Sequence, residues 1–341
     1  MRAVVLDRPG PVENLKVREL ALPPEREGWV RIRVEAFGLN RSELHTRLGL
    51  AEGVTFPRVL GIECAGVVDA APAGSGLRPG AKVVAMMGGM GRQFDGGYAE
   101  YTSVPSSQVL PIETDLPWEI VGALPEMLQT AHGSLSVGLD LRPGQSLLIR
   151  GGTSSVGLAA ASLARELGAT VFSTTRRADR LDELARHGVD HPLVDDGHVA
   201  EAVRRLAPAG VDAALELIGA PTLHDTLRAV RVQGTVCFTG MLSNEWVVKD
   251  FYPIAYIPTG VRLTAYGGDA SDLPAAVFQR QLDAIAAGRL QVRVHKVYDG
   301  LEQVAQAHAD LESNVAVGKL VVRVRHERAA AGPGDRQTSA S

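Results

Sequence analysis

The sequence predicts an α/β protein made of a β-rich domain and a doubly wound parallel-sheet domain. Two features indicate this division. Up to about residue 115 the chain reads as short strands broken by Gly and Pro, whereas from about Leu141 to Gly267 short apolar strands alternate with helical stretches. The length of 341 residues is also sufficient for two domains with separate hydrophobic cores.

The β-rich part is predicted from apolar or alternating runs that are separated by turn signals such as Arg78-Pro79-Gly80. Strands are expected at Ala3–Leu6, Trp29–Glu35, Gly66–Asp69 and Ala81–Ala85. Their frequent Gly and Pro punctuation is typical of an antiparallel or mixed sheet with short connections.

The parallel-sheet part is predicted from strands that alternate with helices. Strands are expected at Ser146–Arg150, Thr170–Thr174, Val211–Glu216, Thr235–Thr239 and Val261–Tyr266, with a weaker one near Pro192–Val194. The helix after the first of these strands should end at Gly168, which can adopt the left-handed conformation of a helix C-terminus. Its apolar face is expected to contain Val156, Ala160, Leu163, Ala164 and Leu167.

The last part of the chain is expected to return to the β-rich domain. Beyond Gly268 the pattern predicts a helix at Leu273–Ala287, a strand, a helix at Leu301–Leu311 and a strand at Lys319–Val324. The predicted domains are therefore residues 1–120 with 269–325 and residues 121–268. Residues 326–341 are small, polar and charged, which predicts a disordered tail.

Composition excludes several classes of protein. The net charge of −4 leaves no surplus of basic residues for binding nucleic acid or anionic lipid. The two cysteines, Cys64 and Cys237, are far apart, which argues against a disulfide framework and favours a reducing compartment. The N-terminus has no signal-peptide pattern, and no apolar run is long enough to span a membrane. We expect a cytoplasmic enzyme.

A glycine-rich turn between the first parallel strand and its helix predicts a dinucleotide site. In the G-x-G-x-x-G register, Gly152 and Gly157 hold the outer positions and Ser154 replaces the middle glycine. Backbone amides and the positive end of the helix would face a pyrophosphate. The residues expected to bind the cofactor here are Gly152, Thr153, Ser154, Ser155, Val156 and Gly157. The alternative is a strand-to-helix turn without a ligand.

The end of the second parallel strand favours NADPH over NADH. An enzyme that prefers NAD carries Asp or Glu at this position, to bind the ribose hydroxyls. Here Thr175, Arg176 and Arg177 follow Ser173-Thr174, and no acid is present. Guanidinium groups form charge-assisted hydrogen bonds to a 2′-phosphate, worth about 1.5–3 kcal/mol each. The alternative is that these arginines only solvate the start of a helix, although cations oppose the helix dipole there.

Several motifs together resemble the quinone oxidoreductase branch of the medium-chain dehydrogenase/reductase superfamily. Besides the glycine turn, they are Gly38–Glu43, Val59–Gly66, Gly96–Tyr101 and Gly318–Val322. The resemblance spans roughly residues 1–325 in the expected order. It implies a GroES-like β-rich catalytic domain and a Rossmann dinucleotide-binding domain. A homodimer formed through the edge strand Val261–Tyr266 is also implied, as in many members of the family.

The resemblance also implies that the catalytic zinc of other superfamily members is missing. Asn40, Ile62 and Glu126 stand at the positions that match the ligands of that zinc. Isoleucine cannot coordinate a metal, and thiolate and imidazole are what a catalytic zinc prefers. Without a Lewis acid, alcohol oxidation near neutral pH is disfavoured, whereas a quinone or an α,β-unsaturated carbonyl is already electrophilic. No metal is expected.

Polar residues near the matching positions are the candidates for catalysis. By resemblance, Asn40 would donate its amide to the substrate carbonyl, and Arg41 would contact the cofactor pyrophosphate. Ser42 and His45 match a proton relay, although quinone reductases often have Tyr in place of His45, which leaves the proton donor open. A loop histidine without a role is the alternative. Glu63 is expected to be a structural ion partner, and Glu126 has no assigned role.

Further residues are implied beside the nicotinamide, at the carboxyl ends of the parallel strands and on a nearby helix. They are Thr130, Gly240, Met241, Tyr266 and Gly267. Met86, Met87 and Met90 lie on a glycine-rich stretch, where they either form the wall of an adaptable pocket or simply pack the loop.

These observations predict an NADPH-dependent, zinc-independent reductase that transfers hydride to a small-molecule quinone or enone. One alternative is an enoyl-thioester reductase that acts on an acyl chain carried by coenzyme A or a carrier protein. Another is a non-catalytic protein that binds or senses NADPH. A panel of quinones, enones and enoyl thioesters would separate the three, because the last predicts binding without turnover.

Overall fold

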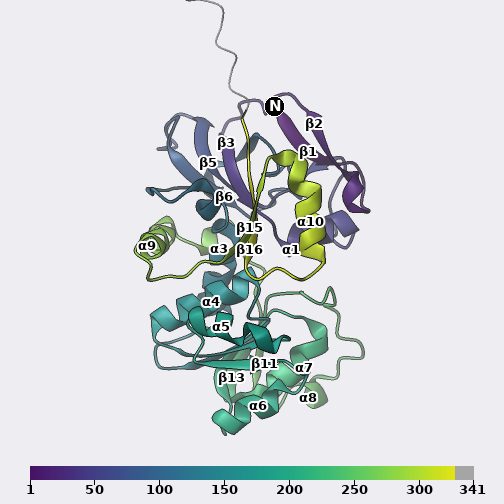
Figure 1. Cartoon of the computed structure of the whole chain (residues 1–341), viewed down its shortest axis with the longest axis vertical. Coiled ribbons are helices and arrows are strands. Elements are labelled where there is room, and N and C mark those ends of the chain that lie inside the picture. The colour runs from purple at the N-terminus through teal and green to yellow at the C-terminus, as the bar shows by residue number, and fades with distance from the viewer. Residues whose placement is uncertain (327–341) are drawn as a thin grey trace, which may run out of the picture.

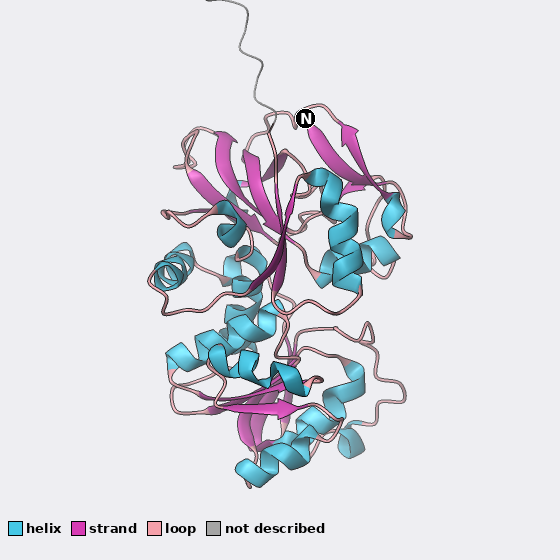
Figure 2. Cartoon of the chain, in the orientation of Figure 1, coloured by secondary structure: helices cyan, strands magenta, loops and turns pink. Residues whose placement is uncertain are grey.

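The computed structural model describes residues 1–326, which form two sheet-based regions arranged one above the other (Figure 1). The N-terminal half of the chain builds most of the upper region, and the middle of the chain builds the lower region. Figure 2 shows that the upper region is rich in strands, whereas helices flank the lower sheet. Within residues 1–326, no helix is both long enough and apolar enough to cross a bilayer.

Alternation of apolar side chains explains the upper sheet. In β3 (Trp29–Gly38), Val30, Ile32 and Val34 point into the core while the residues between them are partly exposed. The seven-stranded sheet has the order β15-β16-β3-β5-β6-β8, with β7 also paired to β3. Its other strands are β5 (Glu63–Ala70), β6 (Lys82–Met86), β7 (Tyr101–Pro105), β8 (Val109–Pro111), β15 (Val294–Asp299) and β16 (Lys319–Arg323).

A smaller sheet and two helices complete the upper region. The sheet has the order β2-β1-β4, formed by Leu15–Glu19, Arg2–Leu6 and Arg58–Val59. The helices are α1 (Arg41–Leu48), which begins directly after β3, and α10 (Val304–Glu312), which precedes β16. β16, the last strand of the described residues, pairs antiparallel with β3, one of the first. This pairing places Lys319, the first residue of β16, beside the end of β3.

The lower sheet is parallel throughout, with the strand order β11-β10-β9-β12-β13-β14. This is the doubly wound order of dinucleotide-binding domains, in which successive strands are added outward on one side of β9 and then, from β12 on, outward on its other side. The strands are β9 (Ser146–Arg150), β10 (Thr170–Thr175), β11 (His191–Val194), β12 (Val211–Glu216), β13 (Val230–Phe238) and β14 (Arg262–Ala265). Ligands bind such sheets at the carboxyl ends of the strands, next to that reversal of the strand order.

Helices cover both faces of the lower sheet. One face packs against α3 (Pro125–Gly133), α4 (Ser155–Leu167) and α5 (Leu181–Arg186), and the other against α6 (Val199–Leu206) and α7 (Ala220–Ala229). Burial on both faces explains why the central strands are nearly continuous apolar runs. The remaining helices are α2 (Trp118–Val121), α8 (Pro253–Tyr256) and α9 (Ala275–Ala286).

Two details of the predicted helix pattern were wrong. Gly168 does end α4 in the left-handed conformation, with φ of 87°. However, Leu167 is 39% exposed, whereas Leu158 and Ala161 are buried. Leu158 and Ala161 are buried because α4 packs against α3 as well as the sheet, which widens its buried face. The predicted helix at Leu301–Leu311 is a short 3₁₀ turn at Leu301–Gln303 followed by α10.

Two predicted boundaries also change. β13 begins at Val230, directly after α7, so it starts five residues before the predicted Thr235–Thr239 strand. The predicted tail does not start at residue 326, because His326 Nε2 lies 2.8 Å from the carbonyl oxygen of Val34. The rest of the predicted tail, residues 327–341, lies outside the described residues.

Candidate cofactor and acceptor site

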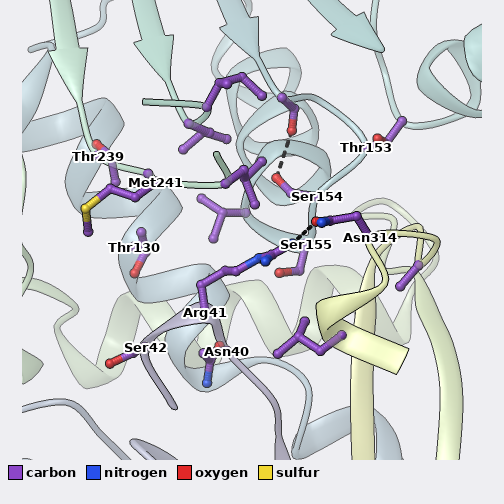
Figure 3. Close-up of a pocket in the computed structure, with 18 of the residues that line it drawn as sticks. Asn40, Arg41, Ser42, Thr130, Thr153, Ser154, Ser155, Thr239, Met241 and Asn314 are labelled. Carbon is purple, nitrogen blue, oxygen red and sulfur yellow. Dashed lines mark hydrogen bonds between the residues drawn. The ribbon is translucent and has the colours of Figure 1, made fainter. Parts of the chain in front are cut away.

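A cavity of about 710 Å³ lies between the two regions, at the carboxyl ends of the lower strands. Figure 3 shows its wall, with Arg41 extending from the upper region toward Asn314 and the glycine turn on the far side. Most of the residues predicted from sequence reach this cavity. They are Asn40, Arg41, Ser42, His45, Thr130, Thr153, Ser154, Ser155, Val156, Thr175, Arg176, Arg177, Gly240, Met241, Tyr266 and Gly267.

The glycine turn forms one wall of the cavity. Ser154 caps α4, because its Oγ accepts a hydrogen bond from the Gly157 amide at 3.1 Å. Gly152 and Gly157 do not line the cavity, although we expected both to bind the cofactor. A Cβ on Gly152 would lie 1.8 Å from Ser173 Oγ, and one on Gly157 would lie 2.7 Å from the Gly151 carbonyl oxygen. These two glycines therefore permit close packing of α4 on the strand ends.

The arginines at the end of β10 differ in their freedom to bind a ligand. Arg176 is exposed and lines the cavity, and within residues 1–326 its guanidinium has no hydrogen bond or ion pair. Arg177 is held by Asp179, with Nε–Oδ1 at 3.0 Å. Arg180 donates to the Val315 carbonyl oxygen at 2.9 Å. Arg176 is thus the cation at this strand end that is available to a phosphate.

An acid does lie at this end of the cavity, and sequence reasoning missed it because it follows β11 rather than β10. Asp195 lines the cavity, and Arg150 binds it with two hydrogen bonds of 2.7 and 2.8 Å. Burial alone would raise the pKa of Asp195, but Arg150 holds it below its usual range. The buried guanidinium of Arg150, which does not line the cavity, therefore balances the charge of Asp195. As a result, Asp195 does not oppose a phosphate at Arg176.

A second cation faces the same part of the cavity from the upper region. Arg41, the first residue of α1, donates a hydrogen bond to Asn314 Oδ1 (Figure 3). Burial lowers the pKa of Arg41, and the positive charge of Arg176 lowers it further. Two guanidinium groups that repel each other across a cavity form a favourable site for an anion.

Behind the wall of the cavity lies a fully buried ammonium group, that of Lys319. Lys319 Nζ lies 2.8 Å from Glu63 Oε1 and 3.1 Å from Glu126 Oε2, and it donates a further hydrogen bond to Asn40 Oδ1. Burial lowers the pKa of Lys319, but the two carboxylates raise it well above its usual value. Lys319, on β16, is therefore charged and holds together the N-cap of α1, β5 and α3. Sequence reasoning assigned it no role, although a lysine at the start of a buried strand was the available signal.

The predicted role of Asn40 was wrong. Both hydrogens of its amide are already donated, one to Glu63 Oε1 at 2.9 Å and one to Glu43 Oε1 at 3.3 Å, while its oxygen accepts from Lys319. No hydrogen remains for a substrate carbonyl. Asn40 instead begins α1 in a capping box with Glu43 and fixes the position of Arg41.

Glu63 and Glu126 acquire clear structural roles. Glu63 is fully buried and ion-paired to Lys319, which confirms the expectation of a structural ion partner. Glu126, which had no assigned role, also binds Lys319 and accepts a hydrogen bond from Thr130 Oγ1 at 3.1 Å. Burial raises the pKa of Glu63 despite the charge of Lys319. Burial also raises the pKa of neighbouring Glu43 to about 7.

Two groups of α1 that line the cavity, Ser42 and His45, can hold or pass a proton. Ser42 lines the cavity, and its hydroxyl has no hydrogen bond to any other residue within 1–326. His45 Nε2 lies 3.0 Å from Asn244 Oδ1, and its ring contacts Trp246. Burial lowers the pKa of His45, which favours the neutral ring. Because Asn244 Oδ1 can only accept, Nε2 carries the hydrogen that is donated to it.

The methionine-rich loop serves both roles that the sequence left open. Met87 lines the cavity, whereas Met86 and Met90 are buried in the packing of the upper region. Tyr266 also lines the cavity, but its hydroxyl is engaged because it donates to Asp272 Oδ2 at 2.8 Å and accepts from Gln129. We infer that Tyr266 contributes an apolar ring to the wall rather than a free hydroxyl.

Comparisons with known proteins agree with this architecture. Residues 26–114 match the family described as alcohol dehydrogenase GroES-like domain, and residues 187–322 match the family described as zinc-binding dehydrogenase. The synaptic vesicle membrane protein VAT-1 homolog of Mus musculus is 31% identical over 347 residues, which cover 94% of this chain and 83% of that protein.

Solved structures share the whole fold. A mycobacterial protein, Rv1454c, complexed with NADPH has a TM-score of 0.82 and 26% identity, covering 95% of this chain and 99% of that one. An NAD-dependent alcohol dehydrogenase has a TM-score of 0.85 and 27% identity, covering 95% and 100%. Escherichia coli quinone oxidoreductase complexed with NADPH shares the fold, with a TM-score of 0.85, 20% identity and coverage of 95% and 100%.

The order of the domains, the glycine turn at the strand reversal and the identity to the mouse protein lead to one conclusion. The chain belongs to the medium-chain dehydrogenase/reductase superfamily, in its quinone oxidoreductase-like branch.

Proposed function

We propose that the protein is an NADPH-dependent, zinc-independent reductase that transfers hydride to a quinone or an α,β-unsaturated carbonyl compound. The observation that carries this proposal is the buried ammonium of Lys319 among Asn40, Glu63 and Glu126. Asn40 and Glu126 match two of the zinc-ligand positions of related enzymes, so a fixed cation already balances the carboxylates there. An activated acceptor needs no Lewis acid.

The residues present do not fit a catalytic zinc, although one matching family is described as zinc-binding. The side chain of Ile62 has no donor atom, and the amide oxygen of Asn40 is taken by Lys319. Binding Zn²⁺ to Glu126 would place a divalent cation next to a charged ammonium 3.1 Å from that carboxylate. The proposed reaction therefore proceeds without a metal.

The residues present do fit NADPH. Arg176 and Arg41 supply cations for its phosphates, while Thr153, Ser154 and Ser155 line the turn at the start of α4. The structural neighbours include both NADPH-bound and NAD-dependent proteins, so the preference for NADPH rests on Arg176. When bound, the reduced nicotinamide supplies the hydride.

The chain itself must exclude water, orient the acceptor and supply one proton. We place the acceptor at the part of the cavity lined by Ser42, His45, Ile62 and Met87, where Ile62 and Met87 provide an apolar wall. Reduction of an enone places the hydride on the β-carbon and a proton on the α-carbon or the oxygen. Ser42 and His45 are the groups that we assign to this proton, with Ser42 facing the acceptor. Burial favours the neutral form of His45, so we assign it the relay of a proton to Ser42 rather than the role of a standing acid.

A panel of acceptors tests the proposal. NADPH consumption is followed with quinones, enones and enoyl thioesters, and product analysis separates carbonyl reduction from reduction of the carbon–carbon double bond. Turnover confined to enoyl thioesters would support the thioester alternative, and cofactor binding without turnover would support a sensor. A stoichiometric metal that is needed for turnover would overturn zinc independence.

We also propose that the enzyme is a cytoplasmic homodimer. β14 is an edge strand of the lower sheet, and all four of its residues are exposed or partly exposed. Pairing of two β14 strands across a two-fold axis would satisfy their free backbone groups. Light scattering that shows only monomers at micromolar concentration would contradict this arrangement. The two buried, free cysteines are compatible with a reducing compartment.

A further inference from the structure

We propose that Arg92 is a receptor for a carboxylate on the acceptor, so that the preferred substrates are enones or quinones that carry a negative charge. This inference rests on the proposed function and specifies its substrate class. Arg92 lies on the loop between β6 and β7 and lines the cavity together with His45, Ile62 and Met87.

The guanidinium of Arg92 is half-buried, and within the described part of the chain it has no hydrogen bond or ion pair. A cation in such a position loses part of its hydration, and this loss is not offset by a protein partner. Arginines that serve only structure are usually paired, as Arg150 is with Asp195. An unpaired guanidinium at the cavity wall is therefore available to a ligand.

The loop that carries Arg92 is fixed rather than free. The Arg92 amide donates to the Gly89 carbonyl oxygen at 3.1 Å, and the Met87 amide donates to the Ile62 carbonyl oxygen at 2.8 Å. Gly91 packs so closely on Gly61 that an added Cβ would lie 2.7 Å from its carbonyl oxygen. Because the backbone is held at these points, the direction from which Arg92 enters the cavity is determined by the fold.

The charges around the cavity leave Arg92 without a counterpart. Among the described residues, two acids line the cavity, Glu126 and Asp195, and each is neutralised by a buried cation, Lys319 or Arg150. The other four arginines of the lining belong to the phosphate end, in α1 or just after β10. Arg177 and Arg180 have partners in the chain, and Arg41 and Arg176 are assigned to the cofactor phosphates, so Arg92 is the cation of the lining that has no assigned anion.

The location of Arg92 points to the acceptor rather than the cofactor. Its positive charge is close enough to lower the pKa of His45, which we place at the proton-transfer end. A carboxylate can accept two parallel hydrogen bonds from one guanidinium, and its single charge matches that of Arg92. An acceptor whose carboxylate binds Arg92 would lie against Met87 and Ile62, with its reactive carbons toward the nicotinamide side.

Two acceptors with the same enone test this inference, β-acetylacrylate and its methyl ester. Each takes up one hydride and one proton to give the saturated ketone, so only the charge at the far end differs. With saturating NADPH, we expect wild-type kcat/KM to be higher for the carboxylate. Arg92→Gln should lower the ratio of kcat/KM for the carboxylate to kcat/KM for the ester by about 10-fold. This is the low end of the effect expected for a charge-assisted hydrogen bond, because the site is half-exposed.

Arg78→Gln is the matched control, because it removes the same charge from the same region. Arg78 is exposed and lies outside the cavity lining. The substitution should leave the ratio unchanged. Equal ratios for wild type and Arg92→Gln would overturn the inference while the proposed function stands. If no acceptor is reduced, the proposed function fails. Calorimetric titration of β-acetylacrylate into the NADP⁺ complex of each variant then decides the role of Arg92.

Discussion

Replacing Arg176 with alanine should reduce the preference of the enzyme for NADPH over NADH. Arg176 lines the cavity without a partner inside the described chain, so the 2′-phosphate would be its principal anion. A charge-assisted hydrogen bond is worth about 1.5–3 kcal/mol. Because Arg176 is exposed and water screens its charge, we use the lower figure, which corresponds to about a 10-fold change.

The assay is the ratio of kcat/KM for NADPH to that for NADH, measured with one acceptor at fixed ionic strength. Arg176→Ala should lower this ratio about 10-fold, mainly through KM for NADPH, and the effect should shrink as salt is added. Arg177→Ala is the matched control, because Arg177 is already paired with Asp179, and it should change the ratio much less. Equal effects of the two substitutions, or an unchanged ratio for Arg176→Ala, would refute the reasoning.

Three further predictions concern the site and its support. Lys319→Met leaves buried carboxylates without their cation, so it should cost about 3–5 kcal/mol in urea unfolding, and adding Glu63→Gln should restore part of that loss. The pKa of Glu43 is raised to about 7 from its ordinary 4.5, so its contribution to stability is complete below the ordinary value and is lost as the pH rises through 7. Wild type should therefore lose up to about 3 kcal/mol relative to Glu43→Gln between roughly pH 5 and 8. Gly152→Ala, whose Cβ would meet a side-chain oxygen at 1.8 Å, should weaken NADPH binding and lower the melting temperature, whereas Gly267→Ala, with nothing within 4 Å, should not lower it.

Each of these has an outcome that contradicts it. A loss below about 1 kcal/mol for Lys319→Met would mean that the carboxylates are hydrated or protonated, since an unpaired buried charge costs more. A difference between wild type and Glu43→Gln that does not vary with pH would show that Glu43 keeps an ordinary pKa. Similar melting temperatures for Gly152→Ala and Gly267→Ala would indicate that the turn relaxes to admit a methyl group.

The sequence predicted the fold because its main signals are local. Strand periodicity located β9 and β12 at the residues observed, and Gly168 marked the end of α4. The glycine turn and the arginines after β10 also follow one another closely along the chain, so their joint presence at a strand end could be predicted. The long extent of β13 and the exposure of Leu167 were missed, because both depend on what packs around the element.

The ionic cluster around Lys319, at the wall of the cavity, required the tertiary structure. The sequence by itself determined the two-domain architecture, the dinucleotide turn and the absence of a zinc ligand at Ile62. Only the fold brought Lys319 to Asn40, Glu63 and Glu126, across as many as 279 positions of sequence. Local patterns carry no information about such pairings, because a buried charge is stabilised by whichever partners the packing of distant strands places within hydrogen-bonding distance.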